Sequence, residues 1–93
     1  MIVIFEDSFE NGLSKIKDPA LAKRVVNAIE KFKSTNTLRD ISGIKAMQGY
    51  TGFYRLRMGD YRIGFSLEAD GSIILLKFGH RGEFYKYFPK NYA

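Results

Sequence analysis

The stretch FYRLRMGDYRIGF, residues 53–65, carries the clearest structural pattern in the chain, because apolar and polar side chains alternate on both sides of Gly59-Asp60. Alternation with a period of two is typical of a half-buried β-strand. A glycine at the first central position of a two-residue loop suits a type II′ turn, which joins antiparallel strands. The sequence therefore predicts a hairpin that pairs Met58 with Tyr61, Arg57 with Arg62, Leu56 with Ile63, and Arg55 with Gly64.

The predicted hairpin has two chemically different faces, because side chains alternate sides along a strand. One face is apolar and needs helices to cover it; it carries Tyr54, Leu56, Met58, Tyr61, Ile63, Phe65 and Leu67. The opposite face carries Arg55, Arg57 and Arg62. Like charges directly opposite each other destabilise a sheet, so this face calls for an anion.

A third strand is predicted over residues 73–78, after a two-residue turn at Asp70-Gly71. This turn sets Lys77 beside Gly64, and Arg81 follows on the same side. The face of the hairpin that carries the arginines, called the arginine face below, then holds five cations: Arg55, Arg57, Arg62, Lys77 and Arg81. Gly64 in their midst is expected to be a bare spot that the backbone of a ligand can approach.

The N-terminal half is predicted to hold one strand, residues 1–5, and two helices. An apolar stripe of Phe9, Leu13 and Ile16 indicates a short helix, capped by Asp7 or Ser8 and ending near Lys17. In the second helix, Asp18 suits the N-cap and Pro19 the first turn, ahead of the stripe Leu21, Val25, Ala28, Ile29 and Phe32.

Residues 38–52 are expected to form a loop with one short extended piece at 41–47, because glycines interrupt any period. The predicted order is therefore β-α-α-β-β-β. This is an α+β fold in which two N-terminal helices pack on one mostly antiparallel sheet.

Composition limits the function. A length of 93 residues suits one domain, residues 1–93. Without cysteine and with one histidine, the chain favours an activity that uses neither disulfide, metal nor cofactor. No apolar run approaches the ~20 residues of a membrane span, so we expect a cytoplasmic protein that does not bind membranes. The net charge of +5 favours a nucleic acid or an acidic protein as partner.

The arginine face can hold a phosphate bidentately and stabilise the charge of a pentavalent transition state. The alternative is a solubilising face whose arginines pair with Asp60, Glu68 or Glu83. RNA cleavage through the substrate's 2′-hydroxyl would also need a proton acceptor and a proton donor. His80, Tyr85 and Glu83 are the candidates.

The C-terminal residues 80–88 interleave aromatic and basic side chains, a mixture that suits single-stranded RNA. The same segment also fits a helix that closes the core. Phe84 and Phe88 are four residues apart and are expected in the core, whereas Tyr85 is offset and free to project toward the arginines.

Residues 53–65 together with FGHRGEFY, residues 78–85, resemble the RelE/ParE superfamily of bacterial toxins. The resemblance extends over nearly the whole chain and implies a RelE-like fold. It implies a toxin of a type II toxin–antitoxin pair that enters the ribosomal A site, cleaves mRNA without a metal, and is silenced by a cognate antitoxin protein.

By the same resemblance, Arg62 matches the phosphate-binding arginine, Arg81 the arginine that stabilises the transition state or assists the leaving group, and Tyr85 the nucleotide-stacking tyrosine. His80 is a further catalytic candidate, and Arg55, Arg57 and Lys77 are candidates for binding RNA phosphates.

Arg55 and Arg57 depart from the pattern, because the best-known RelE members have lysines there and one of those lysines is the proposed general base. Two alternatives therefore stay open. One is a ParE-type inhibitor of DNA gyrase without nuclease activity, and the other is an RNA-binding relative without catalysis.

Overall fold

The predicted hairpin forms, with the predicted register. The structure is a computed structural model that describes residues 1–93. Strands β3 (Phe53–Met58) and β4 (Tyr61–Leu67) pair antiparallel, and Arg57 lies opposite Arg62. Gly59 has a φ of +60°, the sign that the first position of a type II′ turn requires.

Strand β5 (Ile73–His80) pairs antiparallel with β4, but the loop between them is not the predicted turn. The N–H of Glu68 donates to the carbonyl of Ser72 at 2.9 Å, which closes a three-residue loop. Gly71 in this loop has a φ of +87°, the left-handed conformation that such loops commonly use. The prediction of a two-residue turn was therefore wrong.

A β-bulge compensates for the longer loop. Near the loop Leu75 pairs with Phe65, whereas beyond the bulge Lys77 pairs with Gly64, so Leu76 is the extra residue. Lys77 thus lies beside Gly64 as predicted. Without the bulge, alternation would turn the Lys77 side chain toward the apolar face of the hairpin.

The sheet has five strands in the order β1-β5-β4-β3-β2. Strand β1 (Val3–Phe5) is parallel to β5, and β2 (Ile44–Ala46) is antiparallel to β3 at the opposite edge. The short extended piece predicted in the central loop is β2. The α+β fold with one mostly antiparallel sheet is confirmed.

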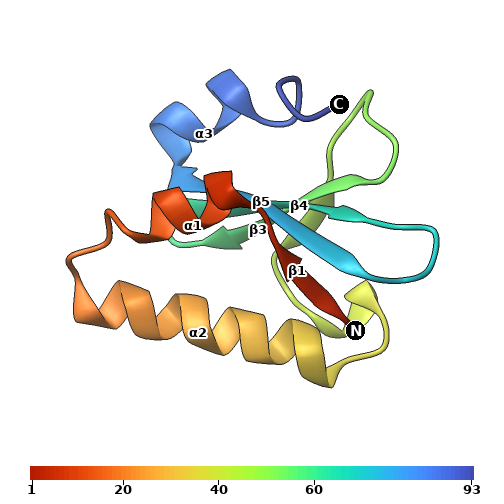
Figure 1. Cartoon of the computed structure of the whole chain (residues 1–93), viewed down its shortest axis with the longest axis horizontal. Helices are drawn as coiled ribbons and strands as arrows, with labels where there is room; N and C mark the ends of the chain where they lie inside the picture. Colours follow the sequence, from red (N-terminus) through yellow and green to blue (C-terminus); the bar gives the residue numbers. More distant parts are fainter.

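Helix α2 (Pro19–Ser34) lies on one side of this sheet, whereas α1 (Asp7–Leu13) lies along the edge of β5 (Figure 1). Asp18 caps α2 as predicted, since its carboxylate accepts the N–H of Ala20 at 2.9 Å. A short 3-10 helix, η1 (Leu38–Asp40), follows α2.

The predictions for α1 were partly wrong. The helix ends at Leu13 instead of near Lys17, because a tighter turn follows it. In this turn the N–H of Ile16 donates to the carbonyl of Leu13, three residues earlier. Neither Asp7 nor Ser8 caps it. The Ser8 hydroxyl instead donates to the carbonyl of Leu76 and fixes α1 to β5.

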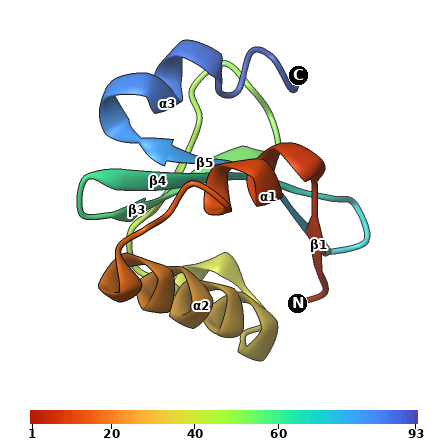
Figure 2. The ribbon, with the colours of Figure 1, turned by 60° about the vertical axis from the view of Figure 1, so that its left-hand side comes forward.

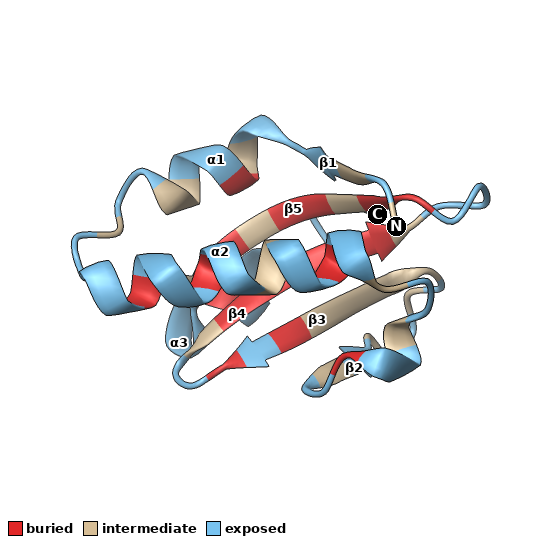
Figure 3. Cartoon of the chain, turned by 90° about the horizontal axis from the view of Figure 1, so that it is seen from below, coloured by how far each residue is buried: buried red, intermediate tan, exposed pale blue.

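The main core lies between the sheet and the two N-terminal helices, and Figure 3 shows buried positions of α2 and the strands facing each other. It holds the predicted apolar stripes and contains Phe9, Leu21, Val25, Phe32, Ile41, Leu56, Met58, Ile63, Phe65, Ile73, Leu75 and Phe78. The Phe32 and Phe65 rings meet edge to face, 5.0 Å apart.

Helix α3 (Arg81–Tyr87) lies on the opposite side of the sheet from α2 (Figure 2). It contributes to a second, smaller cluster of Leu76, Phe84 and Phe88. The prediction that Phe84 and Phe88 are core residues is confirmed. No helix of this fold has both the length and the apolar character that crossing a membrane demands.

Candidate nucleic-acid interface

The β3–β4 turn brings together two arginines that are far apart in the sequence. Arg62 Nη1 donates to the carbonyls of Gly59 (2.7 Å) and Tyr61 (2.9 Å). Arg81 donates its backbone N–H to the carbonyl of Asp60 (2.8 Å), and its Nε lies 3.5 Å from the Asp60 carboxylate. One turn thus positions the guanidinium of Arg62 and the backbone of Arg81.

Arg62 is almost buried, with 9% of its surface exposed, and its Nε has no hydrogen-bond partner. Leaving a buried guanidinium N–H unpaired is unfavourable, so the protein itself does not fully satisfy the polar groups of Arg62. The carbonyls that hold Nη1 also reduce the repulsion expected from Arg57 across the hairpin.

The predicted open face of three guanidiniums is therefore not what forms. Arg57 is exposed, but Arg55 is half-buried and donates to the carbonyl of Gly43 at 2.8 Å. Arg62 is buried at the turn. The three cations differ in their freedom to contact a ligand, and Arg57 has the most.

Gly64 is not a bare spot. A Cβ at this position would lie 2.7 Å from Phe88 Cδ1 and 2.8 Å from Phe84 Cζ. The glycine is required because two aromatic rings of the C-terminal segment rest on the strand there. The expectation that a ligand backbone approaches Gly64 was wrong.

The start of α3 presents the C-terminal candidates. His80 is the N-cap, and its Nδ1 accepts the N–H of Gly82 at 3.1 Å. Arg81 and Tyr85 are exposed, Tyr85 to 45%. The rings of Tyr85 and Phe84 meet at a right angle with their centres 5.0 Å apart.

The candidates do not all lie on one side of the sheet. The register pairs His80 with Tyr61, and their rings meet edge to face 5.4 Å apart, whereas Gly79 lies opposite Arg62. Lys77 lies farther along β5, with its ammonium 5.0 Å from the centre of the Tyr87 ring.

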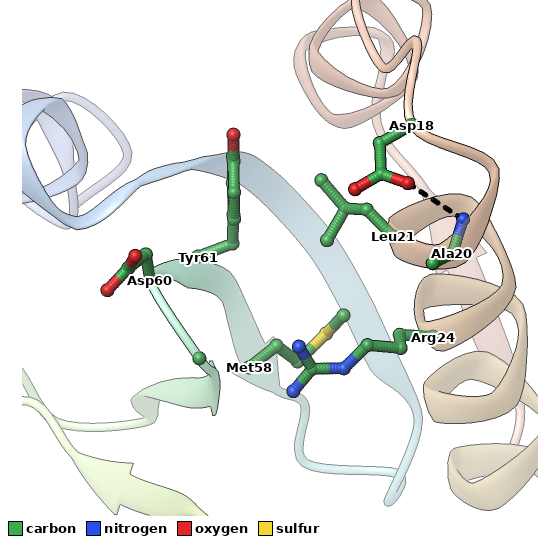
Figure 4. Close-up of a pocket in the computed structure, with 8 residues that line it drawn as sticks. Asp18, Ala20, Leu21, Arg24, Met58, Asp60 and Tyr61 are labelled. Atoms are coloured by element: carbon green, nitrogen blue, oxygen red, sulfur yellow. Dashed lines mark hydrogen bonds between the residues drawn. The ribbon is translucent and has the colours of Figure 1, made fainter.

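Asp60 is one of the three acids named as possible partners of the arginines, and it pairs with Arg81. Sequence reasoning missed Arg24 of α2, whose side chain extends to the turn and lines a cavity of about 320 Å³ with Met58 and Tyr61 (Figure 4). Helical periodicity carries no signal for such a long-range contact.

This geometry agrees with the comparisons with known proteins. A family model described as the ParE toxin of the type II toxin–antitoxin system parDE matches residues 3–85. The chain therefore belongs to this family of type II toxin–antitoxin toxins.

Within that family, the named relatives are RelE toxins. Toxin RelE3 of Methanocaldococcus jannaschii is 37% identical over 96% of this chain and 100% of its own length. The toxin in a RelB–RelE antitoxin–toxin complex from Methanococcus jannaschii is 34% identical, covers 92% of this chain and 99% of its own, and has a TM-score of 0.79. The chain is accordingly of the RelE type.

A more distant neighbour supports the fold alone. The archaeal RelE–RelB complex from Pyrococcus horikoshii contains a chain with 23% identity and a TM-score of 0.71, over 89% of this chain and 97% of its own.

Proposed function

We propose that residues 1–93 act as one toxin domain, a ribosome-dependent endoribonuclease that cleaves mRNA in the A site through attack by the substrate's own 2′-hydroxyl. The observation that carries this proposal is the β3–β4 turn, where the buried Arg62 with its unpaired Nε and the start of α3 at Arg81 come together. Two arginines at one point are suited to hold a phosphate and to stabilise its added charge during cleavage, without a metal.

His80 is the proton donor in this proposal. In the imidazolium form its Nε2 proton passes to the 5′-oxygen as the bond of that oxygen to phosphorus breaks, and the 2′-oxygen closes a cyclic phosphate. The ring is left neutral with its remaining proton on Nδ1, so the contact of Nδ1 with the N–H of Gly82 belongs to the protein without RNA.

The acceptor of the 2′-hydroxyl proton cannot be an arginine, because the guanidinium pKa exceeds 12. Glu83 lines the same groove as His80 and is the acceptor we assign. Tyr85, with its ring exposed on α3, stacks on a base, while Arg57, Arg55 and Lys77 contact neighbouring phosphates.

A cognate antitoxin is the proposed protein partner, by analogy with the RelB–RelE complexes of the structural neighbours. Acidic residues of such a partner would complement the net charge of +5. Its apolar residues would cover Ile2 and Val26, which are 72% and 56% exposed.

The test is to add the protein to ribosomes stalled on a defined message and to map the mRNA ends by primer extension. Discrete A-site cuts by the wild type should disappear in Arg62→Ala and Arg81→Ala. Arg39→Ala is the matched control, since Arg39 is exposed on η1. Circular dichroism of Arg62→Ala checks that loss of this buried side chain has not unfolded the protein.

Two substitutions of His80 separate capping from chemistry. Asparagine is a good N-cap but carries no ionisable ring, so His80→Asn should keep α3 in place and lose most of the cleavage. His80→Ala should lose both.

The family model is named for ParE, which keeps a gyrase inhibitor without nuclease activity as the second candidate. If the mRNA stays intact while the protein stops cell growth and inhibits DNA supercoiling, the gyrase inhibitor is established and the nuclease is overturned. An intact message with RNA bound to the protein would leave an RNA-binding relative.

A further inference from the structure

A groove of about 850 Å³ runs along β5 between α1 and α3. Strand β1 pairs only with Ile73–Leu75, so the rest of β5 has no strand beside it on that edge. Helix α1 lies there instead, with Gly12 so close to the carbonyl of Phe78 that a Cβ would approach it to 2.7 Å. The remaining length of this edge, from Lys77 to His80, lines the groove.

The groove carries cations that have no acidic partner within the protein. Lys15, Lys17 and Lys77 line it, and none of them has a carboxylate within 4.0 Å. Of its two acids, Asp18 caps α2, and Glu83, the proposed proton acceptor, lies 3.5 Å from Lys86. The groove is therefore prepared for an anion with several charges.

The groove also offers surfaces for flat rings. Tyr87 is 45% exposed, and the Lys77 ammonium 5.0 Å from its ring centre holds it at the groove wall. A Cβ on Gly79 would meet no atom within 4 Å, so the floor is open there. Gly79 lies directly opposite Arg62 in the sheet, and His80 and Glu83 line the groove, so one end of the groove includes part of the proposed site of cleavage.

We propose that this groove binds the single-stranded RNA segment that flanks the cleaved phosphate, with Lys15 and Lys17 on its phosphates and Tyr87 under one of its bases. The inference rests on the proposed function, because it extends the RNA from the β3–β4 turn. An acidic segment of the antitoxin is the competing occupant. RNA is favoured because evenly spaced negative charges and flat bases match both the free lysines and the exposed ring.

The experiment measures binding of a fluorescent single-stranded RNA, about ten nucleotides long, over a range of salt concentrations. Each phosphate contact to a single strand contributes about 0.7 to the slope of log K against log salt, so Lys15→Gln/Lys17→Gln should lower that slope by about 1.4. The control Lys23→Gln/Lys33→Gln removes the same charge from the exposed surface of α2 and should leave the slope unchanged.

A second pair of variants tests the ring. Tyr87→Ala should weaken binding about 5- to 150-fold, because stacking of a base on an aromatic ring is lost. Tyr87→Phe keeps the ring and should bind as the wild type does.

Cleavage on ribosomes reports on the proposed function, and binding of free RNA reports on the groove, so the two fail separately. Equal slopes for the groove variant and its control would overturn the groove proposal while A-site cleavage by the wild type still stood. A groove variant that loses affinity for the antitoxin and not for RNA would also overturn it. If the substitutions at Lys15 and Lys17 weaken RNA binding but the wild type cleaves no mRNA, the groove proposal is supported and the nuclease proposal is refuted.

Discussion

Replacing Gly64 with alanine tests how α3 is attached to the sheet. A strand glycine whose neighbourhood is open gains about 0.4–1 kcal/mol of stability on substitution by alanine, because the unfolded chain loses freedom. At Gly64 the new methyl would lie 2.7 Å from Phe88 and 2.8 Å from Phe84. Such overpacking costs about 1–3 kcal/mol, so we expect a net loss of about 1–2 kcal/mol in the free energy of unfolding.

Urea denaturation followed by far-UV circular dichroism measures this loss, since the chain has no tryptophan to report by fluorescence. If the rings of Phe84 and Phe88 cause the destabilisation, Gly64→Ala should cost less in a Phe88→Leu background. The two substitutions should then be coupled by at least about 0.5 kcal/mol.

The opposite outcome would refute this explanation. A Gly64→Ala protein as stable as the wild type but impaired in RNA binding would mean that Gly64 is, after all, the floor of a ligand site. Additive effects of Gly64→Ala and Phe88→Leu would remove the ring contact as the cause.

Three further predictions concern the loops and caps. Asp18→Ala should lower the free energy of unfolding by about 1 kcal/mol, measured by urea denaturation, because it removes the N-cap of α2. The Ser72 hydroxyl, and after it the Ser72 N–H, holds the pKa of Asp70 below its ordinary value of 3.8; Ser72→Ala should raise that pKa toward 3.8 in an NMR titration. Because the Asp70 pKa is lowered by folding, its contribution to stability is present above pH 3.8 and is lost as the pH falls through the folded value. Asp60→Asn should tighten RNA binding at low salt about two- to fivefold, since it removes an exposed carboxylate that competes for Arg81; weaker binding would show that Asp60 positions Arg81 instead.

The sequence was sufficient to predict the hairpin and α2, because each is specified by residues close together. The period of two around Gly59 sets both the turn and the register. Asp18 and Pro19 mark the start of a helix with one apolar stripe, and the helix begins there. In both cases local propensity and the apolar pattern favour the same structure.

The sequence was insufficient to predict the structure wherever the same residues were compatible with two local conformations or two kinds of contact. The residues around Asp70-Gly71 allow a turn of two residues or of three, and the choice depends on whether a bulge later restores the register. A glycine in a strand indicates close approach, but whether of a ligand or of the protein's own rings depends on where Phe84 and Phe88 fall in space.

Helix α3 explains why the candidate site depends on a part of the fold outside the main core. A helix of seven residues is not stable by itself, so its position relies on the tertiary contacts of Phe84 and Phe88 and on the cap provided by His80. The same helix carries Arg81 and Tyr85. Because its cluster contains only three buried residues, small changes there should move the proposed catalytic groups without unfolding the sheet. The stability of α3 and the activity of the protein should therefore vary together across substitutions in this cluster, whereas substitutions in the main core should alter global stability first.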